Sequence, residues 1–481
     1  MTSRPSAPEY RFQPRIINPV RFRRAIVWAA DAELRTSKSV FEESLPWLKT
    51  DVLFDPSGLA RIASDEPSVF LLDDTSLPLL DTVGLRKRNP NAVVVLLSFQ
   101  AFIHCSPPEP ARRKYPYTAK ADLVFAVNRG ELSPARILPY VVRAAEDHFN
   151  IERAGRLRRF IFHVVDDEPR WFSQFLPTLY GIIGQRADVR ISRTFEDGLR
   201  FLFGVDSEDE IQAEDFRRRG HGDDVVCLIT DIYIPKGRDL VAGAGRDLIH
   251  LVKRYYPRIP VIIASKTKEA EEMKDSVFAL PKGDPESLGQ LRDYILNLTG
   301  LGDFLVLDES GREWGRAKTL RGIIRILEQA EEDTPDGRRL RSILEAYGEK
   351  DKFSTWLYMH GYHELGDRLR PRRSRGRRLV RFLKKALGNE VGRIGRTPLC
   401  LGPKKIFNLS GLWNALRDLD PAVLQPYSDN DILSSWLDLR GYPGLAEELR
   451  PIHGSGPSLR RTLVKVVENW IRVYRDEGDP A

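Results

Sequence analysis

The feature of the sequence that most constrains the fold is a series of short apolar runs, each followed by a polar side chain. In residues 159–297 the runs are FIFHVV, VVCLIT, VIIA and VFALP, and amphipathic stretches such as RDLIHLVKRYY separate them. An unbroken apolar run is typical of a parallel strand covered on both faces, and the amphipathic stretches are typical of helices. The alternation predicts an α/β domain with a doubly wound parallel sheet.

The polar residues that follow these runs form the predicted site: Asp166, Asp167, Asp231, Ser265 and Lys282. Because the carboxyl ends of parallel strands converge on one edge of the sheet, we expect all five side chains at that edge. Three carboxylates attract a hard divalent cation with oxygen ligands, such as Mg²⁺. The cation would let a carboxylate attack a phosphoryl donor, while the lysine and the hydroxyl hold the phosphoryl oxygens.

The order Asp-Asp, Asp, Ser, Lys at successive strand ends resembles the receiver domain of two-component response regulators. The resemblance implies a flavodoxin-like fold, a sensor histidine kinase as phosphodonor and Asp231 as the phosphoacceptor. It implies Asp166 and Asp167 as the other acids of the Mg²⁺ site, completed by the backbone carbonyl of Tyr233. It also implies Ser265 as the switch hydroxyl and Lys282 as the lysine that senses the phosphoryl group.

The sequence departs from the receiver pattern around the face that transmits the signal. The two acids Asp167 and Asp231 are 64 positions apart because of a polar insertion, and GRDLVAGAG follows the acceptor as a possible lid. Ala279 stands where the aromatic switch residue is expected, and the usual Lys-Pro order is inverted to Pro281-Lys282. These departures keep open a scaffold that uses receiver folds only for protein contacts.

A weaker copy of the same pattern occupies residues 21–150. Its runs AIVWAA, VFLLD, VVVLL and VFAVN lead to Asp31, Asp74, Ser98 and Arg129. The first acid is replaced by Ala30 and the lysine by Arg129, so we expect a degenerate receiver with little or no phosphorylation. Arg129 could pair permanently with Asp74, or the domain could be an inert copy that packs on its neighbour.

No Gly/Ser linker separates the two α/β copies. The stretch from 135 to 160 predicts a helix with the apolar face Ile137, Leu138, Val141, Val142 and Ala145, which runs almost directly into the second copy. We therefore expect the two domains to pack in a fixed relation. The same helix could pair with its mate in a homodimer.

The C-terminal part contains an internal repeat. DKFSTWLYMHGYHELGDRLRP returns 80 positions later as a closely similar segment, with Trp, Tyr and Arg matched in both copies. The matched residues are Trp356, Tyr362 and Arg370, and Trp436, Tyr442 and Arg450. The spacing predicts two small helical domains with a core Trp in each, in which Gly-Tyr separates two helices and Pro371 or Pro451 ends the second. A hairpin with its turn at residues 309–311 should precede the first.

This repeat resembles a poorly characterised module found beside receivers in bacterial proteins that carry phosphoenolpyruvate-synthase-like or kinase regions. The WL…L…LRP core carries the likeness over roughly residues 302–390 and 404–475. It implies a signalling or docking role, and no catalytic region of those proteins follows. We therefore expect the chain not to be an enzyme.

Composition excludes several other classes. No apolar run reaches the 18 residues of a membrane span, and the start lacks the apolar core of a signal peptide. The 3 cysteines have no metal-ligand spacing, which fits a reducing bacterial cytoplasm. The net charge of +7 is mild, but RLRPRRSRGRRLVRFLKK at 368–385 is dense enough to contact nucleic acid.

The predicted organisation has five parts: a flexible arm (1–20), a degenerate receiver (21–150), a receiver (156–300) and two helical modules (301–395 and 396–481). The predicted function is signal transduction, with phosphorylation of Asp231 read out by an unknown downstream protein. A phosphorylation-independent scaffold and a DNA-binding regulator remain alternatives.

Overall fold

The computed structural model describes residues 20–476 with gaps. The residues outside the description are 1–19, 36, 46–47, 54–57, 59–60, 80–83, 101–119, 128–133, 153–159, 185–186, 212–218, 238, 258, 266–277, 283–284, 350, 361, 370–373, 430–431, 451, 453–455 and 477–481. The chain divides into two compact units, residues 1–183 with 187–292 and residues 184–186 with 293–481. Because this division groups both α/β copies together, the five predicted domain boundaries stay predictions.

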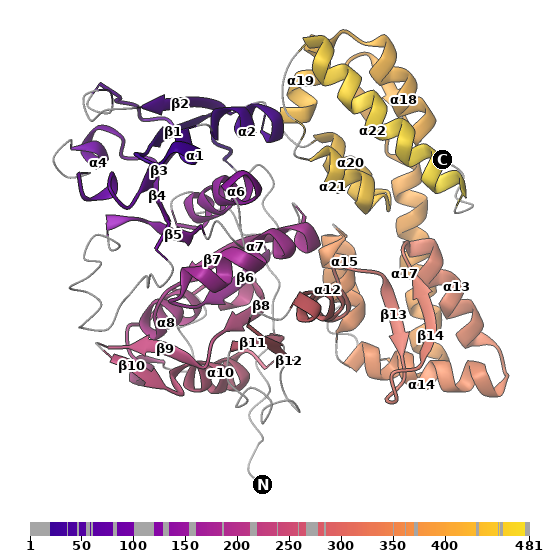
Figure 1. Cartoon of the computed structure of the whole chain (residues 1–481). Helices are drawn as coiled ribbons and strands as arrows, with labels where there is room; N and C mark the ends of the chain where they lie inside the picture. The colour runs from indigo at the N-terminus through magenta and orange to yellow at the C-terminus, as the bar shows by residue number, and fades with distance from the viewer. Residues whose placement is uncertain are drawn as a thin grey trace. The chain divides into compact units, whose positions relative to one another are not determined.

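The first α/β domain contains one sheet of five strands (Figure 1). Its strands are β1 (Arg24–Trp28), β2 (Lys49–Leu53), β3 (Ser68–Asp73), β4 (Ala92–Ser98) and β5 (Leu123–Ala126). Its helices are α1 (Ala32–Arg35), α2 (Ser37–Ser44), the short η1 (Leu77–Leu79), α4 (Leu85–Arg88) and α6 (Pro134–Glu152). All neighbouring strands are parallel, in the order β2-β1-β3-β4-β5.

The second α/β domain repeats this topology. Its sheet strands are β6 (Phe160–Val165), β7 (Ala187–Ser192), β8 (Val225–Thr230), β11 (Val261–Ser265) and β12 (Phe278–Pro281). A hairpin of β9 (Tyr233–Lys236) and β10 (Asp239–Ala242) follows β8. The helices are α7 (Pro169–Ile183), α8 (Phe195–Phe203), η3 (Glu208–Glu210), η4 (Gly222–Asp224), α10 (Ala244–Tyr255) and α12 (Pro285–Thr299).

The second sheet has the order β12-β11-β8-β6-β7, and every neighbouring pair is parallel. In both sheets the first strand of the copy lies between the second and the third, which is the flavodoxin-like order. The strands β3, β4, β6 and β8 are buried at every position, as expected of strands covered on both faces. The predicted doubly wound fold is therefore confirmed for both copies.

The helix α6 joins the two α/β domains. The apolar face predicted for it is buried throughout. It contacts β4 of its own domain and β7 and α7 of the second domain, while α7 contacts β5 of the first (Figure 1). The two α/β domains therefore pack directly on each other, as the absence of a linker predicted.

A buried polar network holds this contact together. The carboxylate of Asp147 on α6 accepts hydrogen bonds from the Tyr180 hydroxyl at 2.7 Å and the Val189 amide at 2.8 Å, both in the second domain. Arg143 binds the same carboxylate at 2.9 Å and donates to the Ala187 carbonyl at 3.0 Å. Burial alone would lower the pKa of Arg143, but Asp147 outweighs it and raises the pKa. The guanidinium of Arg143 therefore stays charged inside the interface.

The C-terminal unit contains two copies of one module, a two-stranded hairpin followed by five helices (Figure 1). The first copy contains β13 (Phe304–Leu307), β14 (Glu313–Ala317), α13 (Leu320–Glu331), α14 (Pro335–Glu349), α15 (Lys352–Met359), α16 (His363–Leu369) and α17 (Gly376–Arg396). The second contains β15 (Leu399–Leu401), β16 (Lys404–Ile406), α18 (Leu409–Asp418), α19 (Pro421–Asp429), α20 (Ile432–Leu439), α21 (Pro443–Leu449) and α22 (Gly456–Asp476).

Equivalent hydrogen bonds recur in the two copies of the module. Thr319 and Asn408 each cap the helix after the hairpin, by accepting the amide of Gly322 and of Gly411. The hydroxyl of Tyr347 accepts the hairpin amide of Leu307, and that of Tyr427 accepts the hairpin amide of Gly402. The two repeated segments therefore lie among elements of the same order, which include a second hairpin that the sequence did not indicate.

The two matched tryptophans lie in the cores of their modules. Trp356 is 2% exposed and Trp436 is 9% exposed. His360 stacks on Trp356 with ring centroids 3.9 Å apart, and Arg440, at the matching position, lies 4.3 Å from the Trp436 ring. Tyr362 and Tyr442 follow the break between two helices, as predicted. Arg450 is buried, whereas Arg370, Pro371 and Pro451 lie outside the described residues.

Candidate functional site

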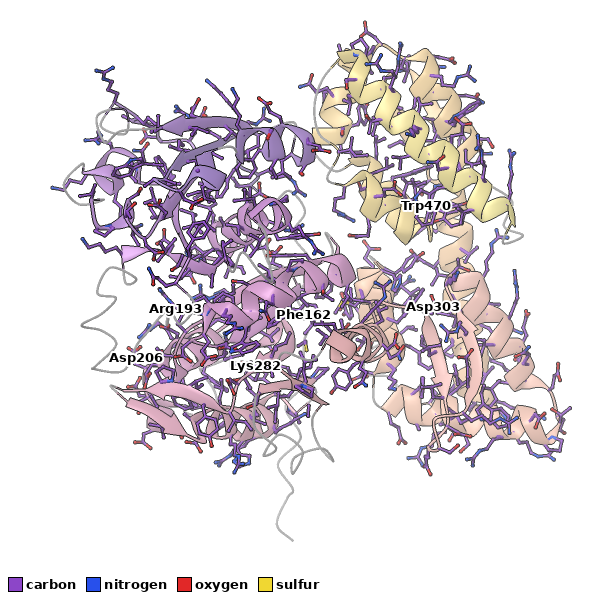
Figure 2. The ribbon with its side chains drawn as sticks, viewed as in Figure 1. Phe162, Arg193, Asp206, Lys282, Asp303 and Trp470 are labelled. Carbon is purple, nitrogen blue, oxygen red and sulfur yellow. The ribbon has the colours of Figure 1, made fainter. Side chains whose placement is uncertain are left out.

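The candidate site lies where the second sheet changes winding direction, at the carboxyl ends of β6 and β8. Asp166 directly follows β6, Asp231 directly follows β8 and Lys282 follows β12. The ammonium of Lys282 (labelled in Figure 2) lies 2.6 Å from Asp166 Oδ2 and 2.5 Å from Asp231 Oδ2. Its side chain is 3% exposed. Three of the five predicted residues therefore meet around one buried cation.

Main-chain bonds hold the two carboxylates at this edge. The Asp166 amide donates to the Ser192 carbonyl at 3.0 Å, and the Asp231 amide donates to the Val165 carbonyl at 3.2 Å. The second oxygen of each carboxylate also accepts an amide, from Glu168 at 2.9 Å and from Ile232 at 2.6 Å. The carboxylates are therefore fixed by the strands themselves, which leaves little freedom to move apart.

Burial controls the electrostatics of the site. Burial raises the pKa of Asp166 to about 7; Lys282 opposes the rise and Asp231 adds to it. Burial alone would lower the pKa of Lys282, but the carboxylates of Asp166 and Asp231 outweigh it and raise the pKa. The lysine is therefore a permanent positive charge, while Asp166 can take up a proton near neutral pH.

The other predicted residues of this site are Asp167, Tyr233 and Ser265. They lie at or just after the carboxyl ends of β6, β8 and β11. Asp167 and Ser265 are buried, and the Ser265 carbonyl accepts the amide of Lys282 at 3.1 Å. Tyr233 begins β9, and its amide lies 3.4 Å from Asp231 Oδ1. The segment between Ser265 and β12 lies outside the described residues.

The oxygen-only donor set fits Mg²⁺ chemistry, because carboxylates and a main-chain carbonyl are the ligands this ion prefers. The ammonium of Lys282 stands between the two carboxylates, the position a bridging cation would take. Within the described ranges, no group of three or more His, Cys, Asp and Glu side chains is arranged to hold a metal ion. A metal in the site would therefore require Lys282 to move away from the two carboxylates.

The glycine-rich segment after β10 has a structural role beside Asp231. A Cβ on Gly245, in the first turn of α10, would lie 1.9 Å from the carbonyl oxygen of Asp231. The Gly245 amide donates to the Ile232 carbonyl at 3.0 Å. The helix thus approaches the backbone at Asp231 so closely that only glycine fits.

We expect Gly245→Ala to destabilise the second α/β domain by about 1–3 kcal/mol, because the methyl group would push α10 away from the Asp231 backbone. Gly181→Ala is the matched control, since a Cβ there meets nothing within 4 Å and alanine favours the helix. Hydrogen exchange of β8 and α10 peptides measures both changes. Equal stability of the two variants would contradict the close packing.

Ion pairs and a hydrogen bond hold the hairpin β9–β10 against neighbouring helices beside the site. Lys236 in β9 bridges Glu208 at 2.6 Å and Asp247 at 3.0 Å, and its ammonium lies 4.3 Å from the Phe195 ring centroid. The Gly237 amide donates to Glu196 at 2.8 Å. Within the segment that the sequence suggested as a lid, Asp239–Ala242 form β10, and the hairpin with β9 is anchored on α8 and α10.

At the corresponding edge of the first sheet, the carboxylates accept hydrogen bonds from a hydroxyl and main-chain amides. The Asp74 carboxylate accepts the Ser98 hydroxyl at 2.8 and 3.0 Å and the Phe99 amide at 3.0 Å. Asp31 accepts the Leu34 amide at 3.2 Å and so caps α1. Arg129 lies outside the described residues, so its proposed pairing with Asp74 stays a prediction.

Sequence reasoning missed Asp73, a buried acid of this edge. Its carboxylate accepts the amides of Ala30, Asp31, Thr75 and Ser76 and the Thr75 hydroxyl. Burial alone would raise the pKa of Asp73, but hydrogen bonds from Ser76 and Thr75 hold it below its ordinary value. The motif Asp-x-Thr-Ser after a strand was the available signal, since Asp commonly bonds the amides two or three residues on.

The basic segment 368–385 carries cations that pair with acids of the first helical module. Arg377 binds Asp333 at 3.0 Å, Lys384 binds Glu331 at 2.6 Å, and Arg375 binds Glu349 at 3.0 Å. Arg368 binds Glu390 at 3.0 Å. These partners reduce the positive field that nucleic acid would meet. Arg372 and Arg373 lie outside the described residues.

No family model and no curated protein matches this sequence. Among solved structures, the chain is similar to the crystal structure of a "putative two-component system response regulator/ggdef domain protein", with 16% identity, a TM-score of 0.26, and coverage of 57% of this chain and 98% of that one. A second similar structure is a "Putative sugar binding protein from Salmonella typhimurium LT2", with 12% identity, a TM-score of 0.18, and coverage of 57% and 86%. None of the described helices is long and apolar enough to cross a membrane.

Proposed function

We propose that the protein is a signal-transduction protein that accepts a phosphoryl group on Asp231. The observation that carries the proposal is the meeting of Asp166, Asp231 and Lys282 around one buried charge at the winding switch of a flavodoxin-like sheet. Ligands of such sheets bind at this edge. The residue types found there are the ones that phosphoryl transfer to a carboxylate requires.

The proposed reaction uses a phosphohistidine of a partner kinase as donor. A carboxylate oxygen of Asp231 attacks the phosphorus, and the phosphorus–nitrogen bond breaks with its electron pair passing to the ring nitrogen. The donor ring, protonated on its other nitrogen, leaves as neutral imidazole. A bound Mg²⁺, held by Asp166, Asp167, Asp231 and the Tyr233 carbonyl, would neutralise charge on the transferred group. Lys282 is already within 2.5 Å of Asp231 and would bind the phosphoryl oxygens by a small movement.

Signal output would follow from the change of charge at a tightly packed edge. A phosphorylated Asp231 adds a dianionic group that Lys282 and the Ser265 hydroxyl can bind. Moving Lys282 breaks its contact with Asp166, and moving Ser265 changes the segment after β11. The C-terminal helical modules would then present the altered state to a downstream protein.

We expect acetyl phosphate with Mg²⁺ to add one phosphate per chain, and Asp231→Asn to abolish the addition because the nucleophile is gone. Intact-mass spectrometry of the full chain measures the adduct. Asp206→Asn is the matched control, since Asp206 is an exposed acid of the same domain that pairs only with Arg200 in the described structure. An unmodified wild-type chain, or equal labelling of Asp231→Asn, would refute the proposed site.

A phosphorylation-independent scaffold is the second candidate, and the interface between the α/β domains favours it. The ion pair of Arg143 with Asp147 is buried and satisfied without any ligand, and Lys282 already neutralises the acids of the candidate site. A scaffold of this kind would keep its oligomeric state and partners when beryllofluoride is added with Mg²⁺. A change of either under these conditions favours the phosphoacceptor instead.

A further inference from the structure

The two helical modules differ in what they expose at matched positions. Among the described residues of the C-terminal unit, the exposed large apolar side chains all lie in the second module: Phe407, Ile432 and Val473. The first module has cations at the matched positions: Lys318, Lys352 and Arg393. The repeat of 80 positions gives the last two matches, and the place between the hairpin and the helix cap gives the first. The second module therefore carries apolar surface that its own fold does not require.

Two of these apolar side chains belong to one face of the second module. Phe407 directly follows β16 and is 49% exposed, and Ile432 is 40% exposed in the first turn of α20 (Figure 1). Trp436 lies four positions after Ile432, on the same side of α20. The guanidinium of Arg440 lies over the Trp436 ring and donates to the Phe407 carbonyl, which joins the two parts of the face.

Arg440 places a positive charge on this face. Its guanidinium donates to the main-chain carbonyls of Phe407 and of Thr397, the latter at 2.6 Å, and no carboxylate among the described residues pairs with it. The first module has His360 at the matched position. A hydrogen bond between two charged groups is roughly twice as strong as a neutral one, so a carboxylate would compete for Arg440. The face therefore favours an acidic partner.

The indole nitrogens of the two core tryptophans also differ. Trp356 Nε1 donates to the carbonyl of Gly302, two residues before the first hairpin, at 3.0 Å. Thr397 is two residues before the second hairpin, and Arg440 occupies its carbonyl. Trp436 Nε1 is buried and has no acceptor among the described residues. Because a buried donor without an acceptor costs free energy, the second module would gain by releasing the Thr397 carbonyl from Arg440.

We propose that this face of the second module docks a peptide segment of a partner protein in which an apolar side chain stands beside a carboxylate. The apolar side chain covers Phe407 and Ile432, and the carboxylate binds the guanidinium of Arg440. Arg440 then releases the Thr397 carbonyl to the indole N–H of Trp436. The inference rests on the proposed function only in making the partner a downstream protein, and it does not depend on phosphorylation of Asp231.

The experiment selects peptides from a displayed random library against the full chain and measures their affinity by fluorescence polarisation. Phe407→Lys and Ile432→Lys install the residues of the first module, which folds with lysine at both positions. We expect each change to weaken the selected peptides about tenfold or more, because the apolar contact is lost. Val473→Arg is the matched control, since it makes the same kind of change at an exposed residue of α22. It should leave the affinity unchanged.

Arg440→His tests the charge, because histidine is the residue of the first module and is neutral at pH 8. This change should weaken the selected peptides about tenfold, but it should not weaken the same peptides with the carboxylate replaced by an amide. NMR of the ¹⁵N-labelled indole groups reports the rearrangement. The Trp436 signal, identified by its loss in Trp436→Phe, should move downfield when the peptide binds, because the indole N–H gains an acceptor.

Three outcomes would overturn the inference. One is a selection that yields no peptide whose binding depends on Phe407, and another is a set of selected peptides that share no carboxylate. The third is a wild-type chain that self-associates in sedimentation and becomes monomeric on Phe407→Lys, because the occupant would then be a second copy. Failure of acetyl phosphate to label Asp231, with peptide binding intact, would count against the proposed function alone.

Discussion

Replacing Lys282 with methionine should destabilise the second α/β domain by about 3–5 kcal/mol at pH 8. The change removes the shared partner of two buried carboxylates, so the repulsion between Asp166 and Asp231 is relieved only by protonation of Asp166, which costs free energy at pH 8. Urea unfolding followed by hydrogen exchange of β6 and β8 peptides measures the effect on this domain alone. A loss of less than 1 kcal/mol would contradict the bridging position of the ammonium.

Lys236→Met is the matched control for this change. Lys236 also bridges two carboxylates, those of Glu208 and Asp247, but its side chain is 33% exposed. Because water screens the pair, the control should cost no more than about 1 kcal/mol. The difference between the two lysines isolates the contribution of burial.

The destabilisation caused by Lys282→Met should depend on pH, in a direction that the pKa of Asp166 determines. The pKa of Asp166 in the folded protein is raised to about 7, above its ordinary value of 3.8, so the protonated form stabilises the fold at low pH and this contribution is lost as pH rises through about 7. Without Lys282 the pKa of Asp166 should rise further. The destabilisation by Lys282→Met should therefore be smaller at pH 6 than at pH 8, and Asp166→Asn should remove the difference.

Replacing Asp147 with alanine should cost about 3–5 kcal/mol and loosen the contact between the two α/β domains. The carboxylate of Asp147 binds Arg143, Tyr180 and the Val189 amide together, so its removal leaves a buried cation and two buried donors without their acceptor. Hydrogen exchange of α6 and β7 peptides measures the loosening.

Glu152→Ala is the control in the same helix. Glu152 pairs with Arg190 of the second domain at 3.0 Å, but its side chain is 40% exposed. Removing it should cost at most about 1 kcal/mol and leave the hydrogen exchange of α6 and β7 unchanged. Equal effects of the two variants would show that the buried network does not determine the domain contact.

The sequence predicted the buried strands because a strand that is covered on both faces consists almost entirely of apolar residues. β4 and β8 are apolar almost throughout, and every residue is buried. The strands β2 and β7 were missed because polar residues interrupt them, as in KTDVL and ADVRIS. Both lie at the edge of a sheet, where one side has no neighbouring strand, and this position tolerates polar side chains.

The sequence predicted the hairpin β13–β14 but not the hairpins β9–β10 and β15–β16, because only the first has a strong local turn signal. The turn at residues 309–311 carries a strong local signal, and Gly311 has a positive φ of 82°. The hairpins β9–β10 and β15–β16 are short and lie beside glycines that the sequence alone also permits in loops. Contacts such as the Tyr427 hydroxyl with the Gly402 amide, which span 25 positions, stabilise the second of these and have no local signature.

The sequence by itself determined the two α/β copies, the acids at their strand ends and the repeated helical module. It could do so because strand burial and helical periodicity are properties of neighbouring residues. Only the tertiary structure decided that Lys282 lies between Asp166 and Asp231, that Ser98 binds Asp74, and that α7 is anchored by the first domain. These contacts join residues 24 to 116 positions apart, and their geometry depends on packing that no local pattern encodes.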